Sequence, residues 1–358
     1  MRRSRLCATT AIALPAQTLT TLHSFNRTDG QNPNGLVQAT NGDFYGTTQL
    51  GGANSRGTVF KINPSGTLTT LYSFCSQGGC TDGAYPYAGL IQATNGDFFG
   101  TTPAGGANGY GTVFKVAAGG TLTTLYSFCS QSGCTDGASP HAGLVQATNG
   151  DHYGTTTSGG ANGPGTGTVF RITPSGTLTT LYSFCSQSLV HRRRRPPRGL
   201  VQATDGDFYG TASGSVTNGA GTVFKITPNG TLTTLHRFDW TDGAGPYAGL
   251  VQATNGDLYG TTWYGGAKGD GTVFSLSVGL GPFVKTRPPF GKVGAAVKIL
   301  GTNLTGATSV SFNGTAAKFT VVSRYLITTT VPAGATSGKI QVVTPSRTLS
   351  SNVPFRVP

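Results

Sequence analysis

The residues that could do chemistry in this chain recur at fixed points of a repeating pattern. All 12 acidic residues are Asp, and there is no Glu. One set follows a hairpin glycine (Asp43, Asp97, Asp151, Asp207, Asp257), and another lies in Thr-Asp-Gly (Asp29, Asp82, Asp136, Asp242). Acid–base catalysis needs two groups in different environments, so this repetition favours turn residues. The alternative is that the Thr-Asp-Gly set surrounds an axis and binds a cation or sugar hydroxyls.

Aromatic residues that interrupt the repeat are better candidates for a binding site. Rings beside polar loops suit carbohydrate or protein ligands. These candidates are Trp240, Trp263, Tyr264, Tyr85, Tyr87 and Tyr247, together with His141. The five His are otherwise scattered, and the sequence has no HExxH, phosphate-loop or GxSxG motif. We therefore predict no catalytic residue, metal site or cofactor.

Two pairs of cysteines lie five residues apart, at Cys75 and Cys80 and at Cys129 and Cys134. Local pairs of this kind favour disulfides formed in an oxidising compartment. A zinc site is the alternative, but it needs four ligands and the His residues are not placed to complete it. We expect two disulfides.

These residues lie within a motif, GLVQATNGDFYGTT, that occurs five times. Its copies span Gly35–Thr48, Gly89–Thr102, Gly143–Thr156, Gly199–Ala212 and Gly249–Thr262. GTVFKI-like segments follow all five copies, and GTLTTLYSF-like segments follow the first four. A period near 50 with several strand-like runs per copy is typical of a β-propeller.

The second copy shows the four strands that we expect in each repeat. They are Gly89–Ala93, Asp97–Thr102, Thr112–Val116 and Thr121–Phe128. Asn95-Gly96 predicts a type I′ hairpin turn, with positive φ at both residues. The Gly-Gly loops and the loops between repeats should lie together at one end, where binding usually occurs.

Counting strands predicts an all-β, five-bladed propeller over residues 17–278. The last copy lacks a fourth strand, whereas the chain begins with an unmatched one, Thr18–Phe25. Pairing Thr18–Phe25 with Thr272–Leu276 would close the ring and leave no open edge. An open solenoid is the alternative.

The formal charge of +13 is unevenly distributed. Residues 1–16 contribute +3, residues 281–358 contribute +9 and the five Arg of 191–198 contribute +5, which leaves −4 for the rest. The basic C-terminal part could bind an anionic envelope polymer, although a soluble polar surface explains it equally. Residues 1–16 suggest a truncated signal peptide, or else a misplaced start codon. No apolar run is long enough to cross a bilayer.

The Arg run has a simple origin. Cys-Thr-Asp-Gly-Ala can be encoded GTGCACCGACGGCGCC, read from its second base. Reading from the first base gives Val-His-Arg-Arg-Arg, the sequence of residues 190–194, in register with Cys80–Ala84. We interpret residues 189–198 as a compensated frameshift, genuine or a sequencing error, that removed the partner of Cys185. We therefore predict no nucleic-acid partner.

Two resemblances follow from these motifs. Residues 18–276 resemble the GloVer tandem repeat of bacterial exported proteins. Residues 281–358 resemble the IPT/TIG family through Gly301–Leu304, Val310–Gly314, Gly338–Val343 and Phe355–Val357. The second resemblance implies an immunoglobulin-like β-sandwich that serves as a binding or spacing module.

We therefore expect a monomeric, non-catalytic protein that is secreted or held at the cell surface. It would bind glycan or protein through the long-loop face. One alternative is a propeller enzyme, a lyase or hydrolase acting on polysaccharide. The other is a purely structural surface array, because near-identical repeats need no ligand to be stable.

Overall fold

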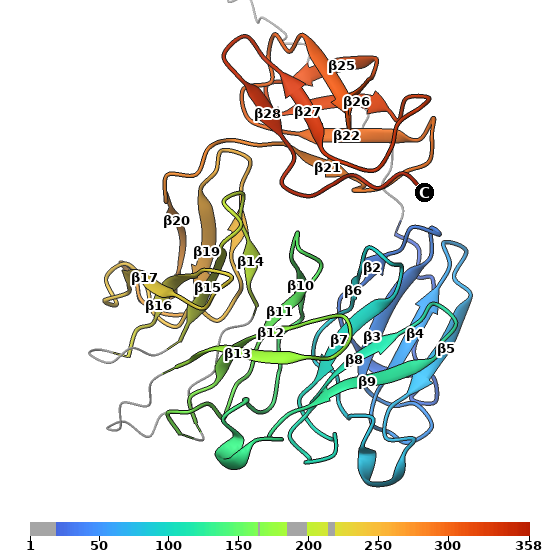
Figure 1. Ribbon diagram of the computed structural model, residues 1–358, viewed down its shortest axis with the longest axis vertical. Helices are drawn as coiled ribbons and strands as arrows, with labels where there is room; N and C mark the ends of the chain where they lie inside the picture. The colour runs from blue at the N-terminus through green and yellow to red at the C-terminus, as the bar shows by residue number, and fades with distance from the viewer. Residues whose placement is uncertain (1–18, 164, 185–198, 214–218) are drawn as a thin grey trace, which may run out of the picture.

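The computed structural model describes residues 19–163, 165–184, 199–213 and 219–358 (Figure 1). Each repeat folds into one antiparallel sheet, and we number these sheets 1 to 5 along the chain. The residues predicted as the signal peptide and as the frameshift lie outside the described residues.

Sheets 1 to 4 each contain the expected four-stranded meander, and sheet 1 has one more strand. Sheet 1 contains β1 (Gln31–Pro33), β2 (Val37–Gln38), β3 (Phe44–Leu50), β4 (Thr58–Ile62) and β5 (Leu68–Ser73). Sheet 2 contains β6 (Ile91–Gln92), β7 (Phe98–Thr102), β8 (Thr112–Val116) and β9 (Leu122–Ser127). Sheet 3 contains β10 (Val145–Gln146), β11 (His152–Thr155), β12 (Thr168–Ile172) and β13 (Leu178–Ser183). Sheet 4 contains β14 (Val201–Gln202), β15 (Phe208–Ala212), β16 (Thr222–Ile226) and β17 (Leu232–Arg237). Sheet 5 has three strands, β18 (Val251–Gln252), β19 (Leu258–Thr262) and β20 (Thr272–Leu276).

The hairpin turn differs from the predicted type I′. Gly96 has a φ of 91°, whereas Asn95 does not have a positive φ. The Gly96 N–H donates to the Ala93 carbonyl at 3.0 Å, and the Ala93 N–H donates to the Asp97 carbonyl at 2.8 Å. This is a type I turn followed by a left-handed glycine, the usual three-residue hairpin. The extra residue before the glycine accounts for the difference.

Neighbouring repeat sheets share a Phe–Phe contact at all four interfaces and a second-strand ring stack at the first three. The phenylalanine after the fourth strand of one sheet meets the third-strand phenylalanine of the next at 5.1–5.6 Å, in the pairs Phe74–Phe114, Phe128–Phe170, Phe184–Phe224 and Phe238–Phe274. Second-strand rings stack at 4.0 Å, in Tyr45–Phe98, Phe99–His152 and Tyr153–Phe208. The hydrophobic core of the repeat region therefore lies between sheets and is rebuilt at every interface.

The predicted pairing of Thr18–Phe25 with Thr272–Leu276 is absent from the structure. Residues 19–25 form no strand and lie against sheet 1, where the Phe25 ring meets Phe60 at 5.1 Å. Sheet 1 and sheet 5 lie on opposite sides of the repeat region (Figure 1). Because packing on sheet 1 holds this segment there, it does not reach β20, which has no further partner among the described residues.

The C-terminal residues form two four-stranded antiparallel sheets that share one core. One contains β21 (Lys285–Arg287), β22 (Ala296–Leu300), β26 (Leu326–Thr330) and β25 (Phe319–Ser323). The other contains β24 (Thr315–Ala316), β23 (Ser309–Phe312), β27 (Ile340–Val343) and β28 (Thr348–Ser350). Val297, Ile299, Phe312 and Ile340 are among the fully buried residues between them. In the part of the chain that is described, no helix has the length and apolarity needed to span a membrane.

These C-terminal sheets sit over the hairpin-turn end of the repeat sheets. The Phe283 N–H donates to the Thr254 carbonyl at 3.0 Å, and Lys285 Nζ donates to the Gln252 carbonyl. Arg356 Nη1 donates to the Ala93 carbonyl of sheet 2 at 3.1 Å. The opposite end of the repeat sheets remains uncovered (Figure 1).

Candidate functional site

The uncovered end, which we call the loop end, is built from two kinds of loop that meet in every described copy. The second glycine of each Gly-Gly loop donates its N–H at 2.8–2.9 Å to a carbonyl of the loop between repeats. The pairs are Gly52 to Arg27, Gly106 to Cys80, Gly160 to Cys134 and Gly266 to Trp240. The loop end is thus a repeated backbone framework, as the meander predicts.

The disulfides Cys75–Cys80 and Cys129–Cys134 are both formed, which confirms the predicted pairing. Each closes a loop around a fully buried carboxylate, Asp82 or Asp136. Asp82 Oδ2 accepts hydrogen bonds from the Tyr72 hydroxyl at 2.7 Å and from the Ser76 N–H at 2.9 Å.

The Asp136 carboxylate repeats these contacts with Tyr126 and Ser130. Burial raises the pKa of Tyr72 and of Tyr126 to about 12, with the neighbouring carboxylates adding to the shift, so both phenols stay protonated donors. Asp82 and Asp136 therefore organise their own loops.

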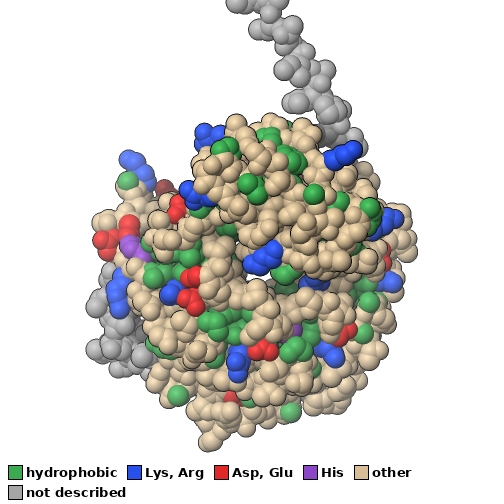
Figure 2. Space-filling view, turned by 45° about the horizontal axis from the view of Figure 1, so that its top comes forward, with side chains coloured by type: hydrophobic (Ala, Val, Ile, Leu, Met, Phe, Trp, Pro, Cys, Tyr) green, Lys and Arg blue, Asp and Glu red, His purple; other side chains and the backbone are tan. Residues whose placement is uncertain are grey.

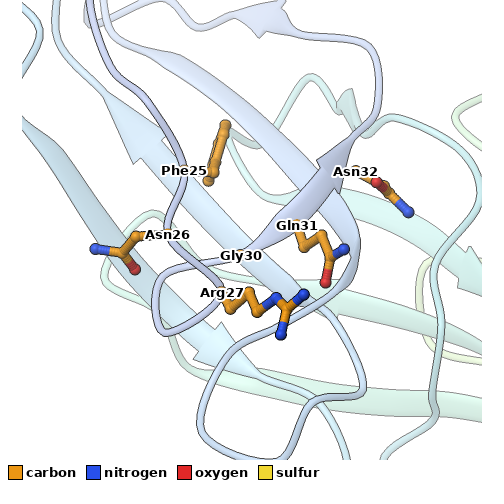
Figure 3. Close-up of a pocket in the computed structure, with 6 residues that line it drawn as sticks. All are labelled: Phe25, Asn26, Arg27, Gly30, Gln31 and Asn32. Carbon is orange, nitrogen blue, oxygen red and sulfur yellow. The ribbon is translucent and has the colours of Figure 1, made fainter.

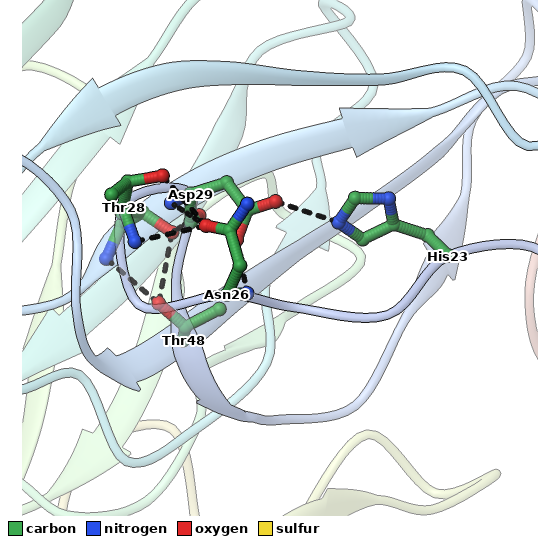
Figure 4. A network of polar contacts seen from close by, with 6 residues as sticks. His23, Asn26, Thr28, Asp29 and Thr48 are labelled. Atoms are coloured by element: carbon green, nitrogen blue, oxygen red, sulfur yellow. Dashed lines mark hydrogen bonds and ion pairs between the residues drawn. The ribbon is translucent and has the colours of Figure 1, made fainter.

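Two copies have a shorter loop without cysteines, and there histidine replaces the tyrosine. His23 Nε2 lies 2.7 Å from Asp29 Oδ2, and His236 Nε2 lies 2.6 Å from Asp242 Oδ2. The loop around Asp29 is completed by the Asn26 side chain, whose Oδ1 accepts from the Thr28 hydroxyl at 2.6 Å (Figure 4). In the short loops, histidine thus replaces the tyrosine hydroxyl as the hydrogen-bond partner of the aspartate.

The described loops between repeats share one backbone conformation but carry different side chains. The residue two positions before the Asp of each Thr-Asp-Gly motif has a φ of 54–75°. These residues are Arg27, Cys80, Cys134 and Trp240. The residue three after has a φ of 53–64°, in Asn32, Tyr85, Ser139 and Gly245. Positive φ in non-glycine residues can mark strained functional sites. Here its recurrence in all four described copies of the loop identifies a structural feature.

A polar cleft lies beside the first short loop and was not predicted from the sequence. It has a volume of about 440 Å³ and is lined by Phe25, Asn26, Arg27, Gly30, Gln31 and Asn32 (Figure 3). Its amide and guanidinium groups could donate hydrogen bonds to a polar ligand. The signal for it was the unique loop sequence FNRTDGQN, which differs from every other copy.

The strongest concentration of exposed aromatic rings lies on the loop end of sheet 5. Trp263 and Tyr264 are 58% and 47% exposed. The Trp263 ring meets Tyr247 edge to face at 5.3 Å and lies 6.4 Å from Tyr264. The backbone joins these residues as well, because the Trp263 N–H donates to the Gly245 carbonyl at 3.1 Å. We call Tyr247, Trp263 and Tyr264 the aromatic cluster.

Trp240 lies in the loop beside the aromatic cluster and is half exposed, and its carbonyl accepts from Gly266. Two carboxylates flank it. Asp242 pairs with His236. The Thr241 hydroxyl and the Asp242 N–H hold the pKa of Asp239 below its usual value, so this carboxylate remains an ionised acceptor.

The other predicted aromatic residues lie apart from this cluster. Tyr87 and His141, from successive repeats, have ring centroids 5.2 Å apart, and both are exposed. Tyr85 is half-buried beneath the Arg56 guanidinium, which lies 4.9 Å from its ring centroid. The repeat pattern marks all these residues as one set of candidates, whereas the structure separates Tyr87 and His141 from the aromatic cluster.

In sheets 2, 3 and 4, the Asp that follows the hairpin glycine faces the basic residue of the third strand. Lys225 Nζ lies 2.7 Å from Asp207 Oδ2, and looser pairs at 3.8 Å join Lys115 to Asp97 and Arg171 to Asp151. Such partly exposed pairs contribute little to stability. Within the described residues, no group of three or more His, Cys or Asp side chains is placed to hold a metal ion.

Comparison with known proteins agrees with the repeat pattern. The model of the Gloeobacter/Verrucomicrobia repeat matches residues 9–194 and 188–310, and the model of the IPT/TIG domain matches residues 284–357. A search of curated proteins found no match.

Several solved structures resemble the chain weakly. A gluconolactonase from Xanthomonas campestris is 15% identical, with 86% of this chain and 88% of that chain covered and a TM-score of 0.41. A putative oxidoreductase (glucose dehydrogenase) from Thermus thermophilus is also 15% identical, with 84% and 97% covered and a TM-score of 0.40. A protein of unknown function from Dyadobacter fermentans is 10% identical, with 83% and 93% covered and a TM-score of 0.40. We draw no conclusion about activity from similarities this weak. By its matched repeats, the chain belongs to the Gloeobacter/Verrucomicrobia repeat family, and it carries an IPT/TIG domain at its C-terminal end.

Proposed function

We propose that this is an exported glycan-binding protein whose ligand lies on the aromatic cluster of sheet 5. The observation that carries the proposal is the contact of Tyr247, Trp263 and Tyr264, two of them about half exposed. None of the other repeats has an aromatic residue at the positions of Trp263 and Tyr264. Positions 263 and 264 correspond to Pro103 and Ala104 in sheet 2 and to Thr157 and Ser158 in sheet 3.

The chemistry of the cluster suits a sugar ring. The C–H face of a pyranose is apolar and packs on an aromatic ring, while its hydroxyl groups need hydrogen-bond partners at the edge. Asp239 is an ionised acceptor in the adjacent loop, and Asp242 beside it is partly exposed. Two exposed Trp rings next to two carboxylates therefore combine an apolar platform with polar edge groups.

The two disulfides support export, because such bonds persist in oxidising compartments. We propose that the module over residues 281–358 acts as a spacer. Figure 2 shows Lys and Arg side chains spread singly over its visible surface, and Lys285 and Arg356 are used to attach it to the repeat sheets. This dispersion favours spacing over the docking of an anionic envelope polymer.

The test is a glycan array with the full chain, followed by calorimetric titration of the best hit. Replacing Trp263 with Ala should weaken binding by about 1–3 kcal/mol, or about 5- to 150-fold, because a buried Trp contact dominates small interfaces. The matched control is Tyr87→Ala, an exposed tyrosine at the position of Tyr247 in sheet 2, which should bind like the wild type.

Equal losses of glycan affinity in both variants, or no glycan bound at all, would show that the aromatic cluster is not a glycan-binding site. Products released from a bound polysaccharide during incubation would instead identify an enzyme.

A further inference from the structure

One face of sheet 5 is exposed although its counterparts in all four other repeats are buried. Val273 is 80% exposed, whereas the equivalent Val59, Val113, Val169 and Val223 are fully buried. Tyr259 is 38% exposed, whereas the equivalent Tyr45, Phe99, Tyr153 and Tyr209 are at most 2% exposed. In sheets 1 to 4 the next repeat covers this face, as when Tyr45 and Val59 share a core with Leu90 and Phe98.

The edge of sheet 5 is also incomplete. In the preceding sheets the third strand pairs with a fourth, as β16 does with β17. β20 pairs only with β19 among the described residues. An open edge beside an exposed apolar face is a template for adding a strand from another segment.

The other end of the repeat region carries the matching half of this interface. Leu36 is 57% exposed, whereas the equivalent Leu90, Leu144, Leu200 and Leu250 are at most 7% exposed beneath a preceding sheet. Residues 19–25 already lie against sheet 1 as a preceding fourth strand would. A Cβ on Gly66 would lie 2.7 Å from the Leu22 carbonyl oxygen, as one on Gly120 would lie 2.8 Å from that of Leu71.

The Phe25–Phe60 contact likewise matches the four interfaces between sheets in distance. Residues 19–25 therefore have the packing of a fourth strand and lack only its sheet partner.

We propose that sheet 5 of one molecule binds sheet 1 of a second copy, with residues 19–25 of that copy adding to β20 as the missing fourth strand. The new interface would repeat the four that exist within the chain, with Tyr259 on Phe44 and Val273 against Leu36, as Tyr45 and Val59 pack with Phe98 and Leu90. Each copy offers both halves, so the contact is heterologous and propagates head to tail. This proposal replaces the monomer expected from sequence.

A second copy fits better than closure within one chain because the C-terminal module braces the repeat region. It holds sheet 5 through Phe283 and Lys285 and sheet 2 through Arg356. In that arrangement the two unmatched ends lie on opposite sides of the molecule (Figure 1). Closing the ring would require these contacts to rearrange, whereas a second copy can bind without disturbing them.

Analytical ultracentrifugation over a concentration series tests the proposal. The wild type should form species that grow with concentration above the 36.6 kDa of one chain. Val273→Lys should block the sheet 5 half and Leu36→Lys the sheet 1 half, and each should sediment as a monomer. Both side chains are exposed, so both variants should keep the wild-type circular dichroism. The matched control is Val322→Lys, a 57% exposed valine on β25 of the C-terminal module, which should assemble normally.

Mixing the two blocked variants separates assembly from ring closure. Each variant retains the half that the other lacks, so the mixture should give a dimer of about twice the mass and nothing larger. A monomeric wild type at every concentration, a mixture that stays monomeric, or equal disruption by Val322→Lys would overturn the proposal. None of these outcomes bears on glycan binding by the aromatic cluster.

Discussion

At the scale of single residues, His152 shows how one substitution within a repeat changes the energetics of the core. It is fully buried at a position that holds phenylalanine in sheets 1, 2 and 4, and its ring stacks on Phe99 at 4.0 Å. Neither ring nitrogen has a hydrogen-bond partner. Burial therefore lowers the pKa of His152 to about 4.

This buried imidazole predicts a loss of stability in mild acid. The unfolded chain takes up the proton near pH 6.5, whereas the folded protein resists it until about pH 4. The free energy of unfolding should thus be unaffected by His152 above about pH 7 and fall between about pH 6.5 and pH 4, by about 2–3 kcal/mol from this group.

His152→Phe should remove that pH dependence. It also removes two buried ring nitrogens that have no hydrogen-bond partner, so it should stabilise the protein at pH 7 by about 1–3 kcal/mol. Thermal unfolding of both proteins from pH 4 to pH 8 measures this. The same slope in wild type and variant would show that His152 finds a partner in solution.

At the scale of elements, the loop between repeats exists in two forms that hold the same aspartate. The long form has a disulfide and a tyrosine donor to a buried carboxylate, and the short form has a histidine donor to a more exposed one. The 10-residue spacing from Tyr72 to Asp82 and the 6-residue spacing from His236 to Asp242 differ by four residues, and the disulfide loop contains the extra ones.

The two loop forms should differ in how much they depend on the aspartate. Asp82→Ala leaves the Tyr72 hydroxyl and the Ser76 N–H buried without an acceptor, so it should lower the free energy of unfolding by about 2–4 kcal/mol. Asp242→Ala leaves the donors to this carboxylate within reach of water, so it should lower the free energy of unfolding by about 1 kcal/mol or less. Melting temperatures of the two variants compare the effects directly, and a larger loss for Asp242→Ala would contradict this view of the loops.

Much of this element-level organisation was predictable because each repeat is a local unit. The strand order, the position of the hairpin turns and the Cys75–Cys80 pairing all depend on residues close together in sequence. The His–Asp pairs, the cleft beside Arg27 and the burial of Asp82 were not predicted, since they depend on how the loop between repeats folds back. The pairing of residues 18–25 failed for a related reason: strand counting identifies a missing partner without showing which surface it packs against.

At the scale of the whole molecule, the C-terminal module is held on the repeat sheets by cations that donate to backbone carbonyls. Burial lowers the pKa of Lys285, helped by the nearby Arg287, and burial also lowers the pKa of Arg356. The repeat turns offer carbonyls in every copy, so placement of the module depends on where these two cations lie. Val353, Pro354 and residues 356–358 thereby help to line a cavity of about 540 Å³ over the turns of sheets 1 to 4.

Arg356 should therefore control how tightly the module is attached. Its guanidinium donates to the Ala93 carbonyl at 3.1 Å and the Gln92 carbonyl at 3.4 Å. Bonds from a charged donor contribute about 1.5–3 kcal/mol, so Arg356→Ala should raise the population of detached modules about 10- to 100-fold. Chymotrypsin cleavage after Leu280 and Phe283 reports that population when opening is fast relative to cutting. Arg347→Ala, an exposed arginine of the same module, should be cleaved at the wild-type rate. If Arg356→Ala is cleaved no faster, the module is held by its contacts with sheet 5, which involve Phe283, Lys285 and Thr302, and the brace that keeps the two ends of the repeat region apart acts through sheet 5 only.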